Sequence, residues 1–335
     1  MSDSKLVNYS VIFIAIVVLV IVLKTLESFL RPFVIAIILT FLFMPLIRQS
    51  QKKKIPFSVS VIGILLIFVV LIGLVGYLVQ ERGSQINDPA QEAKFGKGIE
   101  SINDFGSKFG LDLKKFINSE RASQMIASGI SKSLSTTGAF FAEFFLVLLF
   151  LIFLIPSHRI LIKNIEKTLN VSKGRKFKSV LFKIEQSIKD YLLTKSMISL
   201  GTAVVSAIIL VLFKSESVFL LAFLFFILNF IPNIGSFVAV AIAVILYALT
   251  SGLTIALLWL TVLLVLVQIV FGNILEPKIS GTKLKLSPIV ILLGLLLWGW
   301  IWGIVGMLLA IPLTSIIKII LEHIDSTKTA AKFLS

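Results

Sequence analysis

The 335-residue sequence is 57% hydrophobic and 15% charged, whereas soluble domains have about 45–50% apolar and about 25% charged residues. One water-soluble core could not bury so much apolar surface, so an ordinary soluble protein is excluded and lipid is the expected solvent. No cysteine is present, which excludes disulfides, and the net charge of +15 is explained by Lys and Arg retained on the cytoplasmic side of a membrane, so nucleic acid is not an expected partner.

Three apolar runs open the chain, at 7–23, 29–47 and 57–79. Each is long enough for a spanning helix of about 20 residues, and no small-residue cleavage pattern follows the first, which predicts an uncleaved helix. The loop after the second run holds Arg48, Lys52, Lys53 and Lys54 without an acid, and it is therefore predicted to be cytoplasmic. Residues 1–80 are interpreted as a domain of three transmembrane helices with a cytoplasmic N-terminus.

Between 81 and 138 the hydropathy falls, and eight basic residues are nearly balanced by seven acidic ones. This balance is typical of an external segment, and apolar residues at helical spacing within it favour two amphipathic helices on the membrane surface. Residues 81–138 are predicted to be a small extracytoplasmic helical insertion. A C-terminal transmembrane domain is predicted to follow, over 139–335.

The C-terminal domain begins with a span at 139–155, and the loop 156–190 then carries nine Lys or Arg against three acids. This loop is predicted to be cytoplasmic. Two interpretations of its basic residues stay open: a helix lying on anionic lipid headgroups, or a solvated basic face. Further spans are expected at 191–213 and 254–274.

Two apolar segments, 218–249 and 288–320, are longer than one span requires, and Pro and Gly interrupt both. If each is one broken helix, the chain crosses the membrane eight times. If each is a hairpin that returns to the side it entered from, Lys278, Lys283 and Lys285 become cytoplasmic together with the C-terminus, which fits the positive-inside rule better. The fold class is therefore all-α, an integral membrane protein with about eight hydrophobic segments, two of them Pro/Gly-broken hairpins or broken helices.

Polar residues near the first break are candidates for a substrate or ion pathway, because free backbone at membrane depth survives only inside protein or beside a wet cavity. The alternative is that the breaks are kinks without a binding site, because Pro and Gly are common in membrane helices. Hydrogen bonding between helices would also explain Gln268, and a local ion pair with Lys278 or Lys283 would explain Glu276. The candidates are Asn229, Pro232, Asn233, Gly235, Ser236, Gln268, Asn273, Glu276 and Lys278.

The sequence contains few residues that would support catalysis or metal binding. No phosphate-binding loop or nucleophile motif is present, so neither an ATP-driven pump nor an enzyme is expected. The two histidines, His158 and His323, are far apart, so no metal and no cofactor is expected. Glu143 is interpreted as interfacial, Lys195 as reaching the cytoplasmic headgroups, and the tryptophans as interface anchors.

Three passages resemble the autoinducer-2 exporter-like family of bacterial membrane proteins. They read LRPFVIAIILTFLFMPLI near the start, NFIPNIGS in the middle and NILEPKISGTKLKLSPIVILLGLLLWGWIWGIVGMLLAIPL near the end. The resemblance implies a bacterial inner-membrane transporter of that fold, exporting the furanone signal autoinducer-2 or, as in other relatives, exchanging sodium or lithium for protons. The positions matching the family pattern are Pro232, Gly235, Glu276, Pro277, Lys278, Gly281 and Pro288.

Three functions are weighed. The leading hypothesis is a secondary transporter that exports a small polar solute. A sodium (lithium)/proton antiporter is the alternative, weakened by the scarcity of deep acids. A non-transporting scaffold belongs to another class and predicts tightly packed breaks. Small-residue positions such as Gly294, Gly299, Gly303 and Gly306 suit helix packing in a homo-oligomer under every hypothesis.

Overall fold

The structure is a computed structural model, and it divides the chain into two compact units. Unit 1 comprises Met1–Ile62, Phe141–Tyr191 and Thr282–Ser335, and unit 2 comprises Gly63–Phe140 and Leu192–Gly281. The structure describes residues 3–85, 96, 100–101, 103–104, 107, 141–158, 160–162, 164, 171–215, 217–232, 234–280 and 286–334. The predicted division at 80 and 138 stays a prediction, because most of 81–138 lies outside the described residues.

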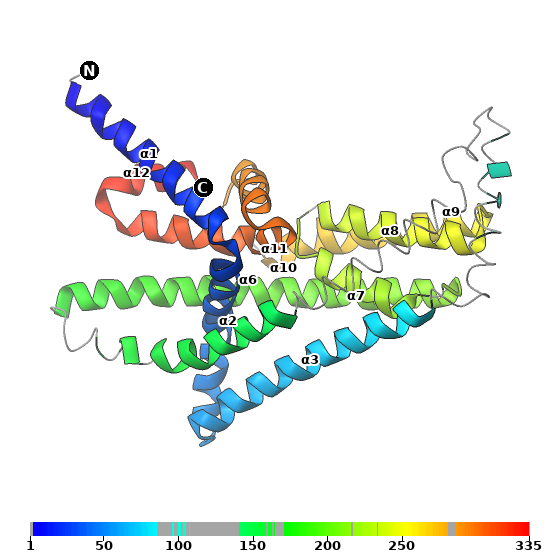
Figure 1. Cartoon of the computed structure of the whole chain (residues 1–335), viewed down its shortest axis with the longest axis horizontal. Coiled ribbons are helices and arrows are strands. Elements are labelled where there is room, and N and C mark those ends of the chain that lie inside the picture. Colours follow the sequence, from blue (N-terminus) through cyan, green and yellow to red (C-terminus); the bar gives the residue numbers. More distant parts are fainter. Residues whose placement is uncertain are drawn as a thin grey trace. The chain divides into compact units, whose positions relative to one another are not determined.

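Every regular element in the described part of the chain is a helix (Figure 1). Unit 1 contains α1 (Asp3–Thr25), α2 (Glu27–Lys52), the Phe141–Ile162 helix, the first half of α6 (Val171–Leu212), α11 (Pro288–His323), η3 (Asp325–Thr327) and α12 (Lys328–Phe333). Unit 2 contains most of α3 (Phe57–Gln85), the second half of α6, α7 (Val218–Leu228), α8 (Ile234–Ser251), α9 (Ile255–Gln268), the π-helix η2 (Ile269–Leu275) and α10 (Glu276–Ser280).

Local sequence explains where two of the spans begin. The side chain of Thr254 caps α9 by accepting a hydrogen bond from the Leu257 amide, and the Ser287 side chain caps α11 through the Val290 amide. Pro288 is the first residue of α11, a position where its missing N–H costs nothing and its fixed φ suits the helix.

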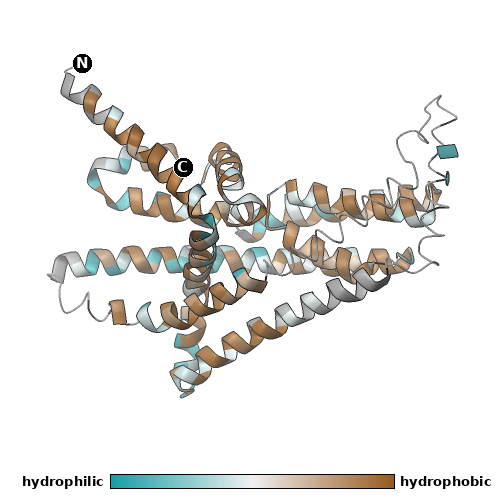
Figure 2. Ribbon diagram, in the orientation of Figure 1, coloured by the Kyte–Doolittle hydropathy of each residue, from teal (hydrophilic) through white to brown (hydrophobic). Residues whose placement is uncertain are grey.

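The helices are apolar on the outside, as a lipid solvent requires (Figure 2). Large side chains such as Phe13, Met197 and Ile255 are mostly exposed, while Ser199 and Ser206 are fully buried. By length and composition, six described helices could span a membrane, and three shorter apolar helices accompany them. The prediction of an all-α integral membrane protein is confirmed, and the number of eight segments stays a prediction.

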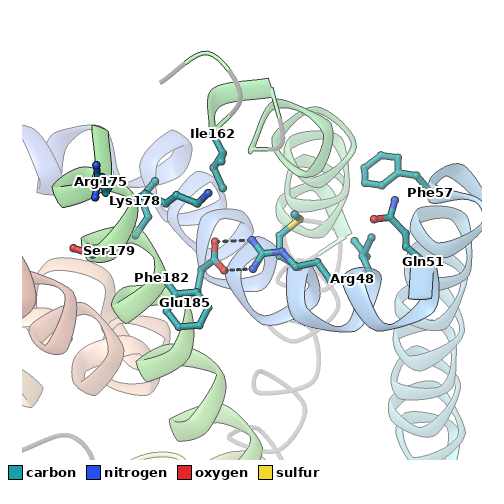
Figure 3. A pocket seen from close by; sticks show the side chains of 12 residues that line it. Arg48, Gln51, Phe57, Ile162, Arg175, Lys178, Ser179, Phe182 and Glu185 are labelled. Carbon is teal, nitrogen blue, oxygen red and sulfur yellow. Dashed lines mark hydrogen bonds and ion pairs between the residues drawn. The ribbon is translucent and has the colours of Figure 1, made fainter. Parts of the chain in front are cut away.

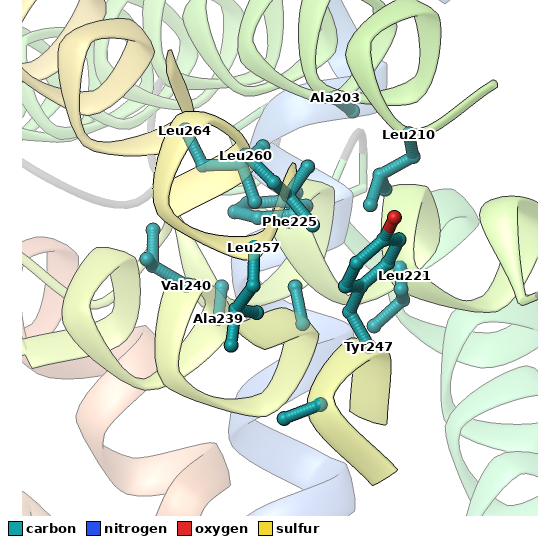
Figure 4. Close-up of a cluster of buried hydrophobic side chains, with 12 residues drawn as sticks. Ala203, Leu210, Leu221, Phe225, Ala239, Val240, Tyr247, Leu257, Leu260 and Leu264 are labelled. Atoms are coloured by element: carbon teal, nitrogen blue, oxygen red, sulfur yellow. The ribbon is translucent and has the colours of Figure 1, made fainter. Parts of the chain in front are cut away.

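The first overlong segment is a hairpin. After α7 the chain turns, and α8 runs back along it, so that the rings of Phe213 and Tyr247 come within 6.5 Å of each other. A straight helix would separate these two residues by about 50 Å at 1.5 Å per residue. Figure 4 shows the apolar core that holds α7 and α8 against α6 and α9. It is built from Ala203, Leu210, Leu221, Phe225, Ala239, Val240, Ala243, Tyr247, Ala248, Leu257, Leu260 and Leu264.

The second overlong segment, α11, also folds back on itself. Its helical backbone breaks at Trp302 and at Gly303, which has φ 63° and ψ −143°. The two arms then pack closely: a methyl group added at Gly294 would lie 2.9 Å from the Thr314 hydroxyl, and one at Gly306 would lie 1.9 Å from the Trp298 carbonyl oxygen. The hairpin interpretation thus holds for both segments, while the side of the membrane on which each opens stays a prediction.

Candidate functional site in unit 2

A buried polar stripe runs along the second half of α6. Lys195, Ser199, Thr202 and Ser206 follow one another at intervals of four, three and four residues, which places them on one face of the helix. All four are buried, although the span around them is apolar. Polar groups in such surroundings require partners. The stripe therefore marks the part of unit 2 where a polar interior exists.

The tip of the first hairpin binds this stripe. The Asn229 amide nitrogen donates to the Ser199 hydroxyl at 3.0 Å, and the Ser236 hydroxyl donates to the Asn229 amide oxygen at 3.3 Å. Asn229 is 3% exposed. A single side chain thus links both ends of the hairpin turn to α6. Of the predicted site residues, the structure brings Asn229 and Ser236 together.

Two further predicted residues shape the turn. Pro232 is half-buried and has no amide hydrogen, so it cannot continue the helical bonding of α7. Gly235 lies so close to α7 that an added methyl group would be 1.7 Å from the Leu228 carbonyl oxygen. Only glycine permits this approach of α8 to the end of α7. Asn233 lies outside the described residues, so its predicted role stays a prediction.

Glu276 forms an ion pair that the sequence did not indicate. Its carboxylate accepts a hydrogen bond from the Lys195 ammonium at 2.6 Å, with Lys195 3% exposed and Glu276 26% exposed. The expectation that Lys195 reaches the lipid headgroups is wrong, because its stem and ammonium are enclosed and its charge is met by Glu276. Lys278, proposed as a partner for Glu276, is exposed, and Lys283 lies outside the described residues.

Gln268 occupies the last position of α9, directly before the π-helix η2. Both polar atoms of its amide are buried, and neither has a hydrogen-bond partner among the described residues; the same holds for the Ser206 hydroxyl. Leaving such groups unpaired is costly, so in α6 and α9 they are the buried side-chain atoms available to a bound solute or water. Asn273, within η2, is exposed.

The π-helix approaches the polar stripe closely. A methyl group added at Gly201 would lie 2.5 Å from the Phe271 ring, so α6 and η2 depend on glycine for their contact. Single-turn π-helical segments within α-helices occur often at functional sites, because they redirect side chains and release backbone groups. Here η2 separates Gln268, whose amide atoms are buried, from Glu276, whose carboxylate is paired with Lys195.

Sequence reasoning missed Ser199, Thr202 and Ser206. Their hydroxyls barely lower the hydropathy of a span, so a search for charges and amides passes over them. The available signal was their spacing with Lys195, which repeats one helix face over three turns. No group of three or more His, Cys, Asp or Glu side chains with metal-binding geometry occurs in the described part of the chain.

A chain of apolar spans that contains two hairpins, one of them bound to a buried polar stripe, has the construction of a membrane transporter. Comparison with known proteins identifies which kind: residues 11–326 match the AI-2E family transporter family, and the chain belongs to that family. The predicted resemblance is thereby confirmed over nearly the whole chain. The protein is a multi-pass membrane protein of a transporter family.

Three relatives cover almost the same length. A Haemophilus influenzae protein, provisionally named a transport protein, is 27% identical over 96% of this chain and 94% of its own length. A Borreliella burgdorferi protein with the same provisional name is 30% identical over 97% of this chain and 90% of its own length. The Escherichia coli K12 protein named AI-2 transport protein TqsA is 29% identical over 91% of this chain and 88% of its own length.

Proposed function

We propose that the protein is a secondary transporter that exports a small polar solute, with the furanone signal autoinducer-2 as the first candidate. The name of the Escherichia coli relative supports that candidate. The observation that carries the proposal is the buried hydrogen-bond chain Ser199–Asn229–Ser236 at the tip of the first hairpin. Such a chain costs more to bury than apolar side chains would, so a role in binding explains its presence.

The site supports a solute with several hydroxyl groups. The unpaired Gln268 amide supplies two donors and an acceptor, and the Ser206 hydroxyl supplies one of each. A polyhydroxylated ring could replace the water that these atoms otherwise bind. The proposed pathway comprises the predicted residues Asn229, Pro232, Asn233, Gly235, Ser236, Gln268, Asn273, Glu276 and Lys278, with Lys195 and Ser199 added from the geometry.

Sodium (lithium)/proton exchange is the second candidate, and the Lys195–Glu276 pair favours it. The pair joins two ionisable groups at 2.6 Å within the long apolar helices Gly174–Leu212 and Ile255–Ile279. Ionisable groups inside membrane spans commonly serve ion or proton pathways. A cation that competes with Lys195 for Glu276 would couple ion entry to release of the lysine.

The membrane setting follows from the charge pattern. We place the protein in the bacterial inner membrane with both termini cytoplasmic. In this orientation the loops at 48–54 and 156–190 lie on the side where Lys and Arg are retained. Anionic headgroups are the proposed partners of the second loop, and further copies of the chain are proposed as partners in a homo-oligomer.

The test is transport in sealed vesicles of the purified protein, measured separately for labelled furanone and for sodium-driven proton movement. Asn229→Ala and Gln268→Leu are expected to lower furanone flux at least tenfold, since each removes a substrate-facing amide worth about 1.5 kcal/mol or more. Thr250→Ala is the matched control: its hydroxyl donates to the Leu246 carbonyl in α8, far along the helix from the tip. Its flux is expected to equal that of the wild type.

The outcomes separate the hypotheses. Furanone flux that survives both amide variants would contradict the proposed site. Proton movement that is lost in Glu276→Gln, without furanone flux in any variant, would favour the antiporter. Absence of both activities in folded protein would favour a non-transporting scaffold.

A further inference from the structure

Unit 1 contains a cavity of about 550 Å³ that the transport site in unit 2 does not use (Figure 3). The end of α2 and the start of α3 line one side of it, and Ile162 and the first turns of α6 line the other. Its volume lies in the range of small-molecule sites, about 300–1,000 Å³. The cavity is therefore large enough for a ligand rather than a few water molecules.

Its charged lining is predominantly basic. Among the described residues that line it, three are basic, namely Arg48, Arg175 and Lys178, and one is acidic, Glu185. Glu185 is already neutralised: it lies 3.1 and 3.3 Å from two nitrogens of Arg48 and 2.8 Å from Nε2 of His158. Arg48 is thus bound to Glu185 in the wall, and a guanidinium that makes two such bonds has three N–H donors left. The net charge facing a ligand is positive.

The remainder of the lining is apolar. Met44 and Ile47 of α2 form a buried wall, and Phe57 and Phe182 stand at the rim, with Phe182 mostly exposed. This combination of basic and apolar lining does not suit a small hydrophilic anion, because the apolar part of the cavity wall would stay in contact with water. It suits a molecule that has an anionic head and hydrocarbon attached to it.

On the proposed topology, on which this inference rests, the loops at 48–54 and 156–190 are cytoplasmic and the cavity lies at the level of the lipid headgroups. Arg48 is near the end of the candidate span Glu27–Lys52, and Arg175 and Lys178 are in the first turns of Gly174–Leu212. Basic pockets between membrane helices on the cytoplasmic side are the usual sites for anionic lipid headgroups. We propose that this cavity binds one anionic phospholipid, with its phosphate at Arg48 and Arg175 and its acyl chains leaving over Phe182 and Phe57.

The experiment is native mass spectrometry of the full-length protein with added phosphatidylglycerol or phosphatidylcholine. The wild type is expected to retain one phosphatidylglycerol at least tenfold more strongly than phosphatidylcholine. The double substitution Arg175→Gln with Lys178→Gln is expected to lower that preference about tenfold, because each basic side chain near a membrane surface contributes severalfold to binding anionic lipid. Both side chains are exposed, so the fold is expected to persist.

The matched control is Lys52→Gln with Lys53→Gln, which removes the same charge from exposed positions outside the cavity lining. This variant is expected to keep the preference of the wild type. Equal losses in the two double variants, or equal retention of the two lipids by the wild type, would overturn the proposal. Displacement of the lipid by equimolar glycerol 3-phosphate would also overturn it, by showing a site for soluble phosphates.

Discussion

The tips of the two hairpins, where the helices are interrupted, are held by different kinds of hydrogen bond. At the first tip, side chains do so: Asn229 binds Ser199 across to α6 and receives a bond from Ser236. At the second tip, α1 provides the partners. The Trp302 indole donates to the Leu23 carbonyl at 3.1 Å, and the Lys24 ammonium donates to the Ile301 carbonyl at 2.9 Å. At the first tip both partners are side chains, which can rotate to exchange partners with a solute, whereas at the second tip every acceptor is a carbonyl fixed in the backbone.

The largest expected effect on stability comes from removing the acid that faces a buried lysine. Each hairpin has such an acid and lysine nearby, so the two can be compared. Glu276→Gln leaves the buried Lys195 without a counter-charge, at an expected cost of about 3 kcal/mol. Glu322→Gln acts on Lys318, also buried but 3.9 Å from a Glu322 that is 45% exposed, and is expected to cost about 0.5 kcal/mol or less. Chemical unfolding in detergent micelles measures both.

Adding Lys195→Met to Glu276→Gln is expected to recover most of the lost stability, because an apolar side chain of similar length carries no charge to desolvate. A double variant as unstable as Glu276→Gln would contradict the role assigned to the unpaired lysine.

The glycines at the two tips are expected to have the next largest effect, for different reasons. Gly235→Ala forces a methyl group against the Leu228 carbonyl, and overpacking of this kind costs about 1–3 kcal/mol. At Gly303 nothing lies within 4 Å of an added methyl group, but φ is 63° and ψ −143°, a conformation costing other residues about 1–3 kcal/mol.

Size separates these two causes. Gly235→Val is expected to unfold at lower denaturant than Gly235→Ala, whereas Gly303→Ala and Gly303→Ser are expected to be equally unstable. Gly63→Ala, with open space around it in α3, is the control and is expected to be neutral or slightly stabilising. A size dependence at Gly303 would contradict the assignment of its cost to the backbone.

The smallest effect is expected just after the second hairpin, at an exposed ion pair. The hydrogen bond from Lys328, the charge of Lys328 and the charge of Lys176, in that order, hold the pKa of Asp325 below its usual 3.8. Because the folded-state pKa is lowered, the stabilisation is present above the unfolded-state value and is lost as pH falls through the folded one.

Comparing the melting temperature of Asp325→Asn with that of the wild type from about pH 6 to about pH 2 tests this contribution. The wild type is expected to melt slightly higher at pH 6, and the difference is expected to vanish at the acid end. A difference that grows on acidification would refute the role of the ion pair.

The sequence predicted the helical membrane class and favoured hairpins over single broken helices for the two overlong segments, since these follow from apolar run lengths and from Pro and Gly within them. It also named Asn229 and Ser236, which the structure brings together. It could not predict the Lys195–Glu276 pair, whose members are 81 residues apart. Trp298 and Trp302 were interpreted as interface anchors, yet both are buried. An indole suits either environment, and only the fold of α11 shows which one it meets. Nothing in the residue pattern of Ile269–Leu275 indicated that this segment forms the π-helix η2.

The π-helix has a consequence for how the chain tolerates insertions and deletions. A π-helical turn equals an α-helical turn with one added residue. Deleting one residue between Ile269 and Leu275 would therefore return the segment to α-helical register without breaking it. The helix would stay whole, and Glu276 would keep nearly its present orientation toward Lys195, because a π turn and an α turn each complete one rotation of the helix. Deleting one residue from the α-helical part of the same span, in α9, would instead rotate Glu276 by about 100° away from Lys195, so the tolerance to deletion is confined to η2.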